Sequence, residues 1–110
     1  MNSLVLKYIL TIAEEKNMTR AAERLYISQP SLSQSLKNLE KELGVDLFER
    51  SRQGVVLTPA GEHYVEWAKQ ILFAEAMMKR KIQDISAKNV RQIKFGTTPQ
   101  RTSYILDFVV

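Results

Sequence analysis

Apolar positions recur with a helical period in residues 4–16. Leu6, Ile9, Leu10 and Ala13 form one apolar stripe, and a second stripe beside it consists of Val5, Tyr8 and Ile12. A surface helix needs only one such stripe, so two stripes indicate burial on two sides. We expect a helix that packs on its own domain with one side. The other side meets another helix, either of this chain or of a second copy, and we assign the second stripe to a dimer surface.

Residues 18–43 predict two helices joined by a tight turn. We expect Thr19 to be the N-cap of the first, with Asn17 as the alternative, because both residue types accept hydrogen bonds from the backbone at helix starts. The second begins at Ser28, a favoured cap. It ends before Gly44, because glycine readily adopts the left-handed conformation that follows many helices.

The second of these helices has two faces of opposite character. On a wheel of about 100° per residue, its apolar side collects Leu32, Leu36, Leu39 and Leu43. The opposite side collects Pro30, Ser33, Gln34, Lys37 and Lys41. Glu40 and Glu42 lie on the flanks, so this polar face carries no carboxylate. A solvated helix face usually mixes charges of both signs, so this one predicts a polyanionic partner, and we expect the helix to enter DNA.

A β-hairpin is predicted for residues 47–58, where two short β-prone runs flank a glycine-containing turn. Arg50 and Arg52 lie at or beside its tip. A hairpin that directly follows a recognition helix is a wing, and its arginines could contact phosphate or enter a minor groove. Without the neighbouring helix, an ordinary solvated loop charge would be the better interpretation of Arg52.

Thr58 and Pro59 open a fourth helix, which we expect to continue to about Ala87 because no proline or glycine follows Gly61 in that stretch. Its apolar residues alternate at spacings of four and three, with Glu75 as one polar interruption, and this heptad seam consists of Tyr64, Ala68, Ile71, Met78, Ile82 and Ile85. So small a domain cannot bury so long a seam. We therefore expect the helix to pair with a second copy, and packing within one chain is the alternative.

The remaining residues predict the entrance to another domain. Residues 86–92 turn polar and predict a linker, residues 93–98 a strand, and residues 99–110 a helix. A lone strand and helix cannot form a stable domain, so most of this domain is expected to lie outside the chain. The expected division is a DNA-binding domain at 1–58, a linker and dimerisation helix at 59–88, and the hinge and first strand and helix of a truncated α/β effector domain at 89–110.

Composition narrows the function only a little. The 110 residues carry a formal net charge of +4, and residues 1–58 hold eight Lys and Arg against seven Asp and Glu. The distribution of charge over helix faces therefore has to support nucleic-acid binding. The absence of cysteine excludes disulfides and thiolate zinc sites and fits a reducing cytoplasm. The apolar run of residues 4–13 is short and contains Lys7, so it predicts a buried helix rather than a signal or membrane segment.

Two other classes of function fit less well. His63, the single histidine, lies beside Glu62 and Glu66, but no third ligand or activated nucleophile is near it in the sequence. We expect a solvated helix residue there, and no enzyme, metal site or cofactor. A winged helix that contacts only proteins would be favoured by acids on the polar face of residues 28–43, which carries lysines and amides instead.

Many positions of residues 1–61 match one family pattern in register and without a gap: Met18-Thr19-Arg20-Ala21-Ala22, Leu25, Ser28-Gln29-Pro30-Ser31, Ser33, Leu36, Leu39-Glu40, Leu43-Gly44, Leu47-Phe48, Arg50, Leu57-Thr58 and Gly61. These residues resemble the N-terminal domain of LysR-type transcriptional regulators. Asn17-Met18 departs from the Ser-Phe that is more frequent in the family. Residues 62–110 fit the family's linker helix and effector-domain entrance in layout.

The resemblance implies a mainly α-helical fold, a winged helix-turn-helix of three helices plus a β-hairpin wing, followed by a long dimerisation helix. It implies a cytoplasmic bacterial regulator that binds double-stranded DNA as a homodimer or a tetramer. The sites in such proteins are interrupted promoter palindromes that begin with T and end with A. A C-terminal domain similar to periplasmic binding proteins senses a small molecule.

The resemblance also implies site residues. The base-facing group is Gln29, Pro30, Ser33 and Gln34, and the partners of backbone phosphates are Thr19, Ser28, Ser31, Lys37 and Arg50. Arg52 or Gln53 is the minor-groove contact of the wing. Thr97 and Thr98 resemble threonines that line the effector pocket.

Overall fold

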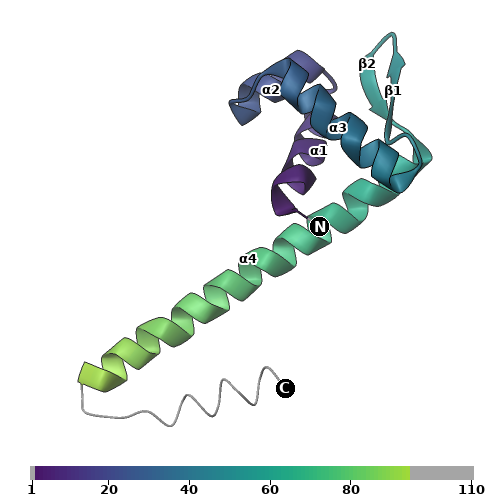
Figure 1. Cartoon of the computed structure of the whole chain (residues 1–110). Helices are drawn as coiled ribbons and strands as arrows, with labels where there is room; N and C mark the ends of the chain where they lie inside the picture. The colour runs from purple at the N-terminus through teal and green to yellow at the C-terminus, as the bar shows by residue number, and fades with distance from the viewer. Residues whose placement is uncertain (1, 95–110) are drawn as a thin grey trace. The chain divides into compact units, whose positions relative to one another are not determined.

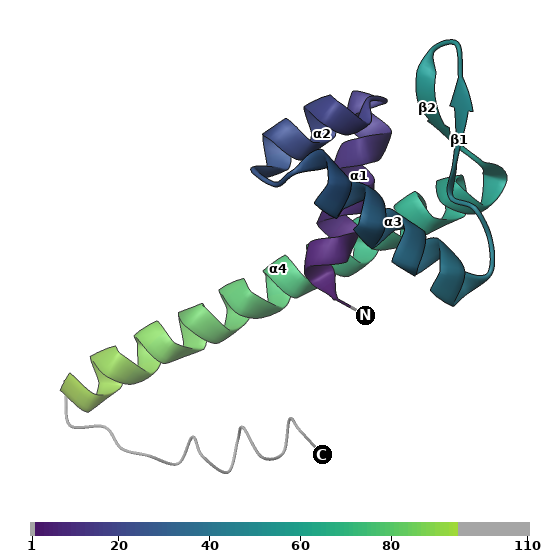
Figure 2. The same ribbon diagram turned by 45° about the horizontal axis from the view of Figure 1, so that its top comes forward.

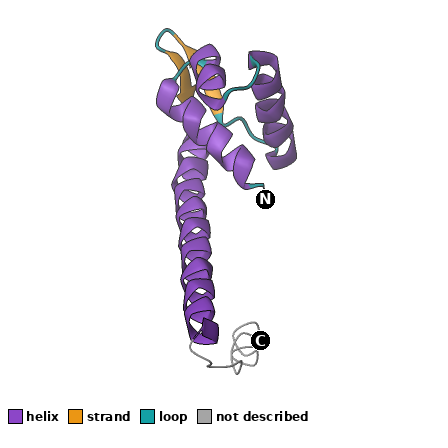
Figure 3. Cartoon of the chain, turned by 90° about the vertical axis from the view of Figure 1, so that its left-hand side faces the viewer, coloured by secondary structure: helices purple, strands orange, loops and turns teal. Residues whose placement is uncertain are grey.

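The computed structural model describes residues 2–94 of the chain (Figure 1). Its elements follow in the order α1 (Ser3–Glu15), α2 (Met18–Leu25), α3 (Gln29–Leu43), β1 (Phe48–Ser51), β2 (Gly54–Leu57) and α4 (Pro59–Lys94). The hairpin, orange in Figure 3, is the one sheet of the described residues. Three helices, a hairpin and a long helix confirm the predicted winged helix-turn-helix fold.

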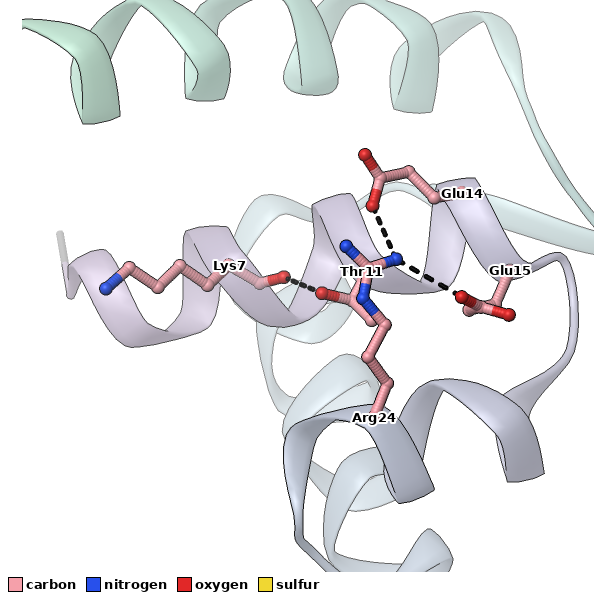
Figure 4. Close-up of polar contacts among 5 residues, drawn as sticks. All are labelled: Lys7, Thr11, Glu14, Glu15 and Arg24. Carbon is pink, nitrogen blue, oxygen red and sulfur yellow. Dashed lines mark hydrogen bonds and ion pairs between the residues drawn. The ribbon is translucent and has the colours of Figure 1, made fainter.

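Residues Met1–Ala74 form one compact unit, in which α1 contacts α2, α3 and β2 (Figure 2). The core of this unit draws side chains from the first three helices and the start of the wing: Ile9, Ile12, Ala21, Ala22, Leu32, Leu39, Leu47 and Phe48. The buried hydroxyl of Thr11 on α1 is satisfied, since Oγ1 donates to the carbonyl of Lys7 at 2.8 Å (Figure 4). The core therefore packs α1, α2 and α3 against one another and against the start of the wing.

Side-chain and glycine caps define the helix-turn-helix. Asn17 caps α2, because its side chain accepts from the backbone N–H of Arg20 at 2.9 Å. The expected cap Thr19 is therefore wrong: Thr19 lies inside the first turn, and Met18, which packs against the core, is the first helical residue. Ser28 caps α3 and Gly44 ends it with a φ of 73°, both as predicted.

Two residues assigned to the dimer surface pack within the chain instead. Ile12 is 0% exposed in the core, and Ala68 on α4 is 1% exposed. A side chain without exposed surface in the single chain cannot contact a second copy, so these two assignments are wrong. Two stripes on one helix do not tell which stripe faces the helix's own domain, and here α1 buries residues of both stripes, among them Ile9 and Ile12.

Contacts on two sides fix the wing to the helices. β1 and β2 pair antiparallel, from Phe48 opposite Leu57 to Ser51 opposite Gly54. At one end, Glu40 of α3 accepts from the backbone N–H groups of Leu47 at 2.7 Å and Phe48 at 3.3 Å. At the other, the backbone N–H of Val55 donates to the carbonyl of Lys16 at 3.0 Å. The wing is thus tied to both α3 and the end of α1.

The fourth helix begins as predicted but ends later. Thr58 Oγ1 accepts from the backbone N–H of Gly61 at 3.0 Å, which confirms the cap. The helix continues to Lys94, so the predicted end near Ala87 and a strand that begins at residue 93 are wrong, and the predicted linker at 86–92 is helical. Polar residues alone do not end a helix, and no proline or glycine occurs between Gly61 and Gly96.

Some predictions lie outside the described residues. Thr97 and Thr98, the predicted effector-binding pair, are among them, as is the predicted helix at 99–110. The division of the chain into three functional parts stays a prediction. No helix of residues 2–94 combines the length and the apolar character that crossing a membrane would require.

Candidate nucleic-acid interface

The polar face of α3 points away from the core. Leu32 and Leu39 are 0% and 6% exposed, and they fix the rotation of the helix about its axis. Pro30, Gln34 and Lys37 are therefore exposed, as the sequence predicted. The remaining members of the leucine face differ, because Leu36 is half-buried and Leu43, at the end of the helix, is 43% exposed.

Hydrogen bonds between side chains order this face. Gln29 Nε2 donates to Ser33 Oγ at 2.9 Å. One turn further along, Gln34 Nε2 donates to Asn38 Oδ1 at 2.8 Å. Each glutamine is thus held by a residue four positions later, and its carbonyl oxygen and second N–H remain available to a partner. The structure brings Gln29 and Ser33 together, two of the four predicted base-facing residues.

Sequence reasoning missed Asn38. This exposed residue is the hydrogen-bond acceptor of Gln34, yet it lies near the edge of the polar face and was not assigned to it. The available signal was the spacing, because glutamine and asparagine four residues apart on a helix are neighbours that hydrogen-bond.

The predicted phosphate contacts lie at exposed positions on several elements. Ser28 and Ser31 adjoin at the start of α3, where the Ser28 hydroxyl donates to Ser31 Oγ at 2.8 Å and accepts from the Ser31 backbone N–H at 3.2 Å. Thr19 lies in the first turn of α2, and Arg50 lies on β1. All four are exposed, and so is Lys37. Helix starts present backbone donors, which favour phosphate oxygens.

The tip of the wing is ordered by a serine. Ser51 Oγ accepts from the backbone N–H of Gln53 at 3.1 Å and donates to the carbonyl of Gly54 at 3.3 Å. Arg52 and Gln53 form the turn between the strands, and both are exposed. The two predicted minor-groove residues are therefore at the tip of the hairpin.

Ion pairs and hydrogen bonds engage some of the charged side chains near the polar face of α3 and leave others available to an anion. The Arg24 guanidinium bonds Glu14 at 2.7 Å and Glu15 at 3.2 Å, joining α2 to α1 (Figure 4). These two carboxylates raise the pKa of Arg24. Glu40, which lies on the flank of the polar face of α3, is engaged by the wing amides. Lys37 and Lys41 form no ion pair among the described residues, so they remain available to an anion.

An apolar groove of about 290 Å³ lies on the same compact unit, away from the polar residues of α3. It is lined by Leu6, Leu43, Val45, Leu47, Ala60, His63, Tyr64, Trp67, Ala68 and Ile71. The Tyr64 hydroxyl is buried without a partner among the described residues, and burial, followed by the charge of Glu42, raises the pKa of Tyr64. Trp67 is 62% exposed. His63 is exposed, and no cluster in residues 2–94 has the ligands for a metal ion.

Comparison with known proteins gives one family. Residues 5–62 match the family model described as "Bacterial regulatory helix-turn-helix protein, lysR family". An uncharacterized HTH-type transcriptional regulator of Bacillus subtilis, YcgK, is 44% identical over 96 residues, which are 87% of this chain and 30% of that protein. The HTH-type transcriptional regulator BudR of Klebsiella aerogenes is 42% identical over 93 residues, 84% of this chain and 65% of BudR. The chain thus spans less than two thirds of the length of these relatives.

Solved structures share the fold. A crystal structure of a CbnR DBD–DNA complex superposes with a TM-score of 0.73 at 38% identity, covering 78% of this chain and 99% of that one. A crystal structure of a BenM DBD with catB site 1 DNA gives a TM-score of 0.74 at 36% identity, covering 78% of this chain and 97% of that one. Both neighbours were solved with DNA.

Proposed function

The chain belongs to the LysR family of bacterial helix-turn-helix regulators, and we propose from this premise that it is the sequence-specific DNA-binding part of a transcriptional regulator. The observation that carries the proposal is the polar face of α3. Buried Leu32 and Leu39 hold this face outward. Its lysines form no ion pair among the described residues, and Glu40 on its flank is engaged by the wing. Such a face suits a polyanion that also presents hydrogen-bonding groups.

The polar face of α3 reads bases in the major groove. A glutamine amide can pair bidentately with the N6 and N7 of adenine, and an apolar contact can recognise the methyl group of thymine. Gln29 and Gln34 perform the first role and Pro30 the second, with Ser33 holding Gln29. Arg52 or Gln53 at the tip of the wing enters an adjacent minor groove, where side chains distinguish mainly A·T from G·C pairs.

Other residues fix the register of the protein on DNA. Contacts to phosphates position a protein but carry no direct sequence information. This role falls to the exposed residues Thr19, Ser28, Ser31, Lys37 and Arg50.

The whole protein is a homodimer or tetramer that binds interrupted palindromes beginning with T and ending with A, under the control of a small molecule bound by a C-terminal domain. Support for dimerisation comes from exposed apolar side chains on α4, namely Ile71 at 40%, Met78 at 54% and Ile82 at 57%. The partly exposed Val5, Tyr8, Tyr64 and Ile85 remain in the proposed dimer surface. The protein is not an enzyme and acts in the cytoplasm, where its DNA lies.

Selection from a pool of random duplexes tests this function. The protein is expected to enrich sequences with two related half-sites in inverted orientation, because two-fold symmetric dimers select two-fold symmetric sites. Enrichment of no sequence over the starting pool would contradict the proposal.

Replacing Lys37 with alanine is expected to weaken binding to every duplex and to lower the slope of log K against log salt by about one unit, because one phosphate contact is lost. Fluorescence anisotropy at several salt concentrations measures this slope. Lys69→Ala removes the same charge from an exposed position on α4 and serves as the control, with an unchanged slope. An unchanged slope in Lys37→Ala would remove Lys37 from the phosphate contacts.

Replacing Gln34 with alanine is expected to cost about 1–3 kcal/mol of binding free energy on the preferred duplex and to relax the preference at one base step, since a bidentate pair is lost. Competition titrations with duplexes substituted one base pair at a time measure the preference. Gln70→Ala changes the same residue type at an exposed position on α4 and should leave the preference intact. An equal loss on all duplexes would exclude base reading by Gln34.

A further inference from the structure

We propose that Asn38 is a positioning residue for DNA specificity, which holds the Gln34 amide in the orientation that reads a base. This role rests on the proposed function, and Asn38 is not among the proposed contacts to bases or phosphates. Gln34 Nε2 donates to Asn38 Oδ1 at 2.8 Å, one helical turn apart on an exposed part of α3.

The hydrogen-bonding capacity of an amide explains how this contact acts. A glutamine side chain carries two N–H donors and one carbonyl oxygen. Asn38 engages one donor of Gln34 and leaves the second donor and the oxygen free. One donor and one acceptor side by side are what the major-groove edge of adenine requires.

Order in the free protein also favours binding. Holding a long, flexible side chain in one rotamer at an interface costs free energy, and a contact that already exists before binding reduces this cost. This lower ordering cost strengthens binding to duplexes in which Gln34 pairs with its base. It has no effect on duplexes in which Gln34 has no partner. Asn38 therefore increases the difference in affinity between the two kinds of duplex, which is the specificity.

The surroundings of Asn38 leave it free for this role. Within residues 2–94, Asn38 has no side-chain hydrogen bond other than the one from Gln34. Its charged neighbours along α3 are Lys37, Lys41 and, four residues later, Glu42, all exposed and without an ion pair in this part of the chain. The same arrangement recurs one turn earlier, where Ser33 holds Gln29. Both proposed reading amides are thus held from the position four residues later.

Base preference in variants of Asn38 tests the inference. Gln34→Ala first identifies the base step that Gln34 reads. Asn38→Ala is then expected to reduce the preference at that step by about two- to tenfold, the cost of ordering one such side chain expressed as affinity. The slope of log K against log salt stays unchanged, since no positive charge is removed. Circular dichroism confirms that each variant is folded.

Asn38→Asp is the matched variant. Its carboxylate still accepts the hydrogen bond from Gln34 at the i,i+4 spacing, so the preference stays within about twofold of wild type. The added negative charge weakens binding to all duplexes alike. If Asn38 only stabilised α3, Asn38→Ala would not lower the base preference at the Gln34 step while Asn38→Asp kept that preference and lost affinity for all duplexes.

Three outcomes would overturn the inference. An unchanged base preference in Asn38→Ala would show that Gln34 reads its base without the hydrogen bond to Asn38. An equal loss of affinity on every duplex, with the preference unchanged, would make Asn38 a phosphate contact. A further loss of preference when Asn38→Ala is added to Gln34→Ala would mean that Asn38 reads a base itself. If the wild-type protein itself showed no base preference, the proposed function would fail as well. The wild-type measurement therefore distinguishes a failure of the inference about Asn38 from a failure of the proposed function.

Discussion

Replacing Leu32 with alanine is expected to lower the free energy of unfolding by about 2–5 kcal/mol, because a fully buried leucine leaves a cavity when it is truncated. Leu32 is 0% exposed and lies in the core that joins α1, α2 and α3. Its loss loosens the contact that sets the rotation of α3. Urea denaturation at fixed protein concentration measures the change, since the stability of a dimer depends on concentration.

Leu43→Ala is the matched control, because Leu43 lies on the same face of α3 but is 43% exposed. We expect it to cost clearly less than Leu32→Ala. Leu36, which is half-buried, should fall between the two. Equal denaturation midpoints for wild type and Leu32→Ala would mean that α3 is rotated differently, and the assignment of its polar face to DNA would fail with it.

Replacing Gly61 with alanine is expected to lower the free energy of unfolding by about 1–3 kcal/mol, as for other side chains forced into a filled space. A Cβ on Gly61 would overlap the carbonyl oxygen of Leu47 and lie 2.8 Å from Leu57 Cδ2. Leu47 directly precedes β1, and Leu57 ends β2, so relief of the overlap displaces the wing. We therefore also expect weaker DNA binding. Thermal unfolding and anisotropy titrations measure the two effects.

Gly44→Ala separates this overlap from the intrinsic cost of replacing glycine. Gly44 has a φ of 73° and open space where its Cβ would lie. Its replacement costs about 1–2 kcal/mol for the left-handed backbone, without displacing the wing. If Gly61→Ala instead stabilised the protein by about 1 kcal/mol, as expected where glycine in a helix has room for a side chain, the close packing of α4 on Leu47 would be contradicted.

The rotation of α3 was predictable because two independent patterns agree. Leucines at spacings of four, three and four mark one side, and carboxylate-free polar residues mark the other. Ser28 and Gly44 set the ends, because serine is favoured directly before a helix and glycine directly after it. Local sequence signals therefore determined this element, and the exposed positions of Pro30, Gln34 and Lys37 followed from it.

Predictions failed where the local sequence allows two conformations or two helix starts and contacts with distant residues decide between them. Asn17 and Thr19 can both cap a helix, and α2 begins at Met18, which packs on the core. Lys16 and Tyr26 end α1 and α2 in left-handed conformations, with φ of 57° and 59°. Neither lysine nor tyrosine is a residue type that favours this conformation, so the sequence did not predict it. Burial of Ile12 likewise depends on neighbours distant in sequence. For α4, the polar composition of residues 86–92 does not end the helix, which continues to Lys94.

The candidate site shows the same limit. Sequence reasoning located the residues of the polar face but not their mutual hydrogen bonds, so it named Gln34 without Asn38. It also placed Glu40 only on the flank of α3, whereas this carboxylate binds the backbone of the wing. Both contacts depend on side-chain rotamers, which helical periodicity does not contain.

The most direct test is the affinity of the protein for a selected duplex and for a scrambled duplex of equal composition, measured from 50 to 200 mM salt. Over this range a protein with about 6–10 phosphate contacts loses affinity by a factor of about 10³–10⁵. Outward-facing amides and lysines on α3 predict tighter binding to the selected duplex at every salt concentration, with both affinities falling steeply as salt rises. Equal affinity for the two duplexes, or no dependence on salt, would contradict the account.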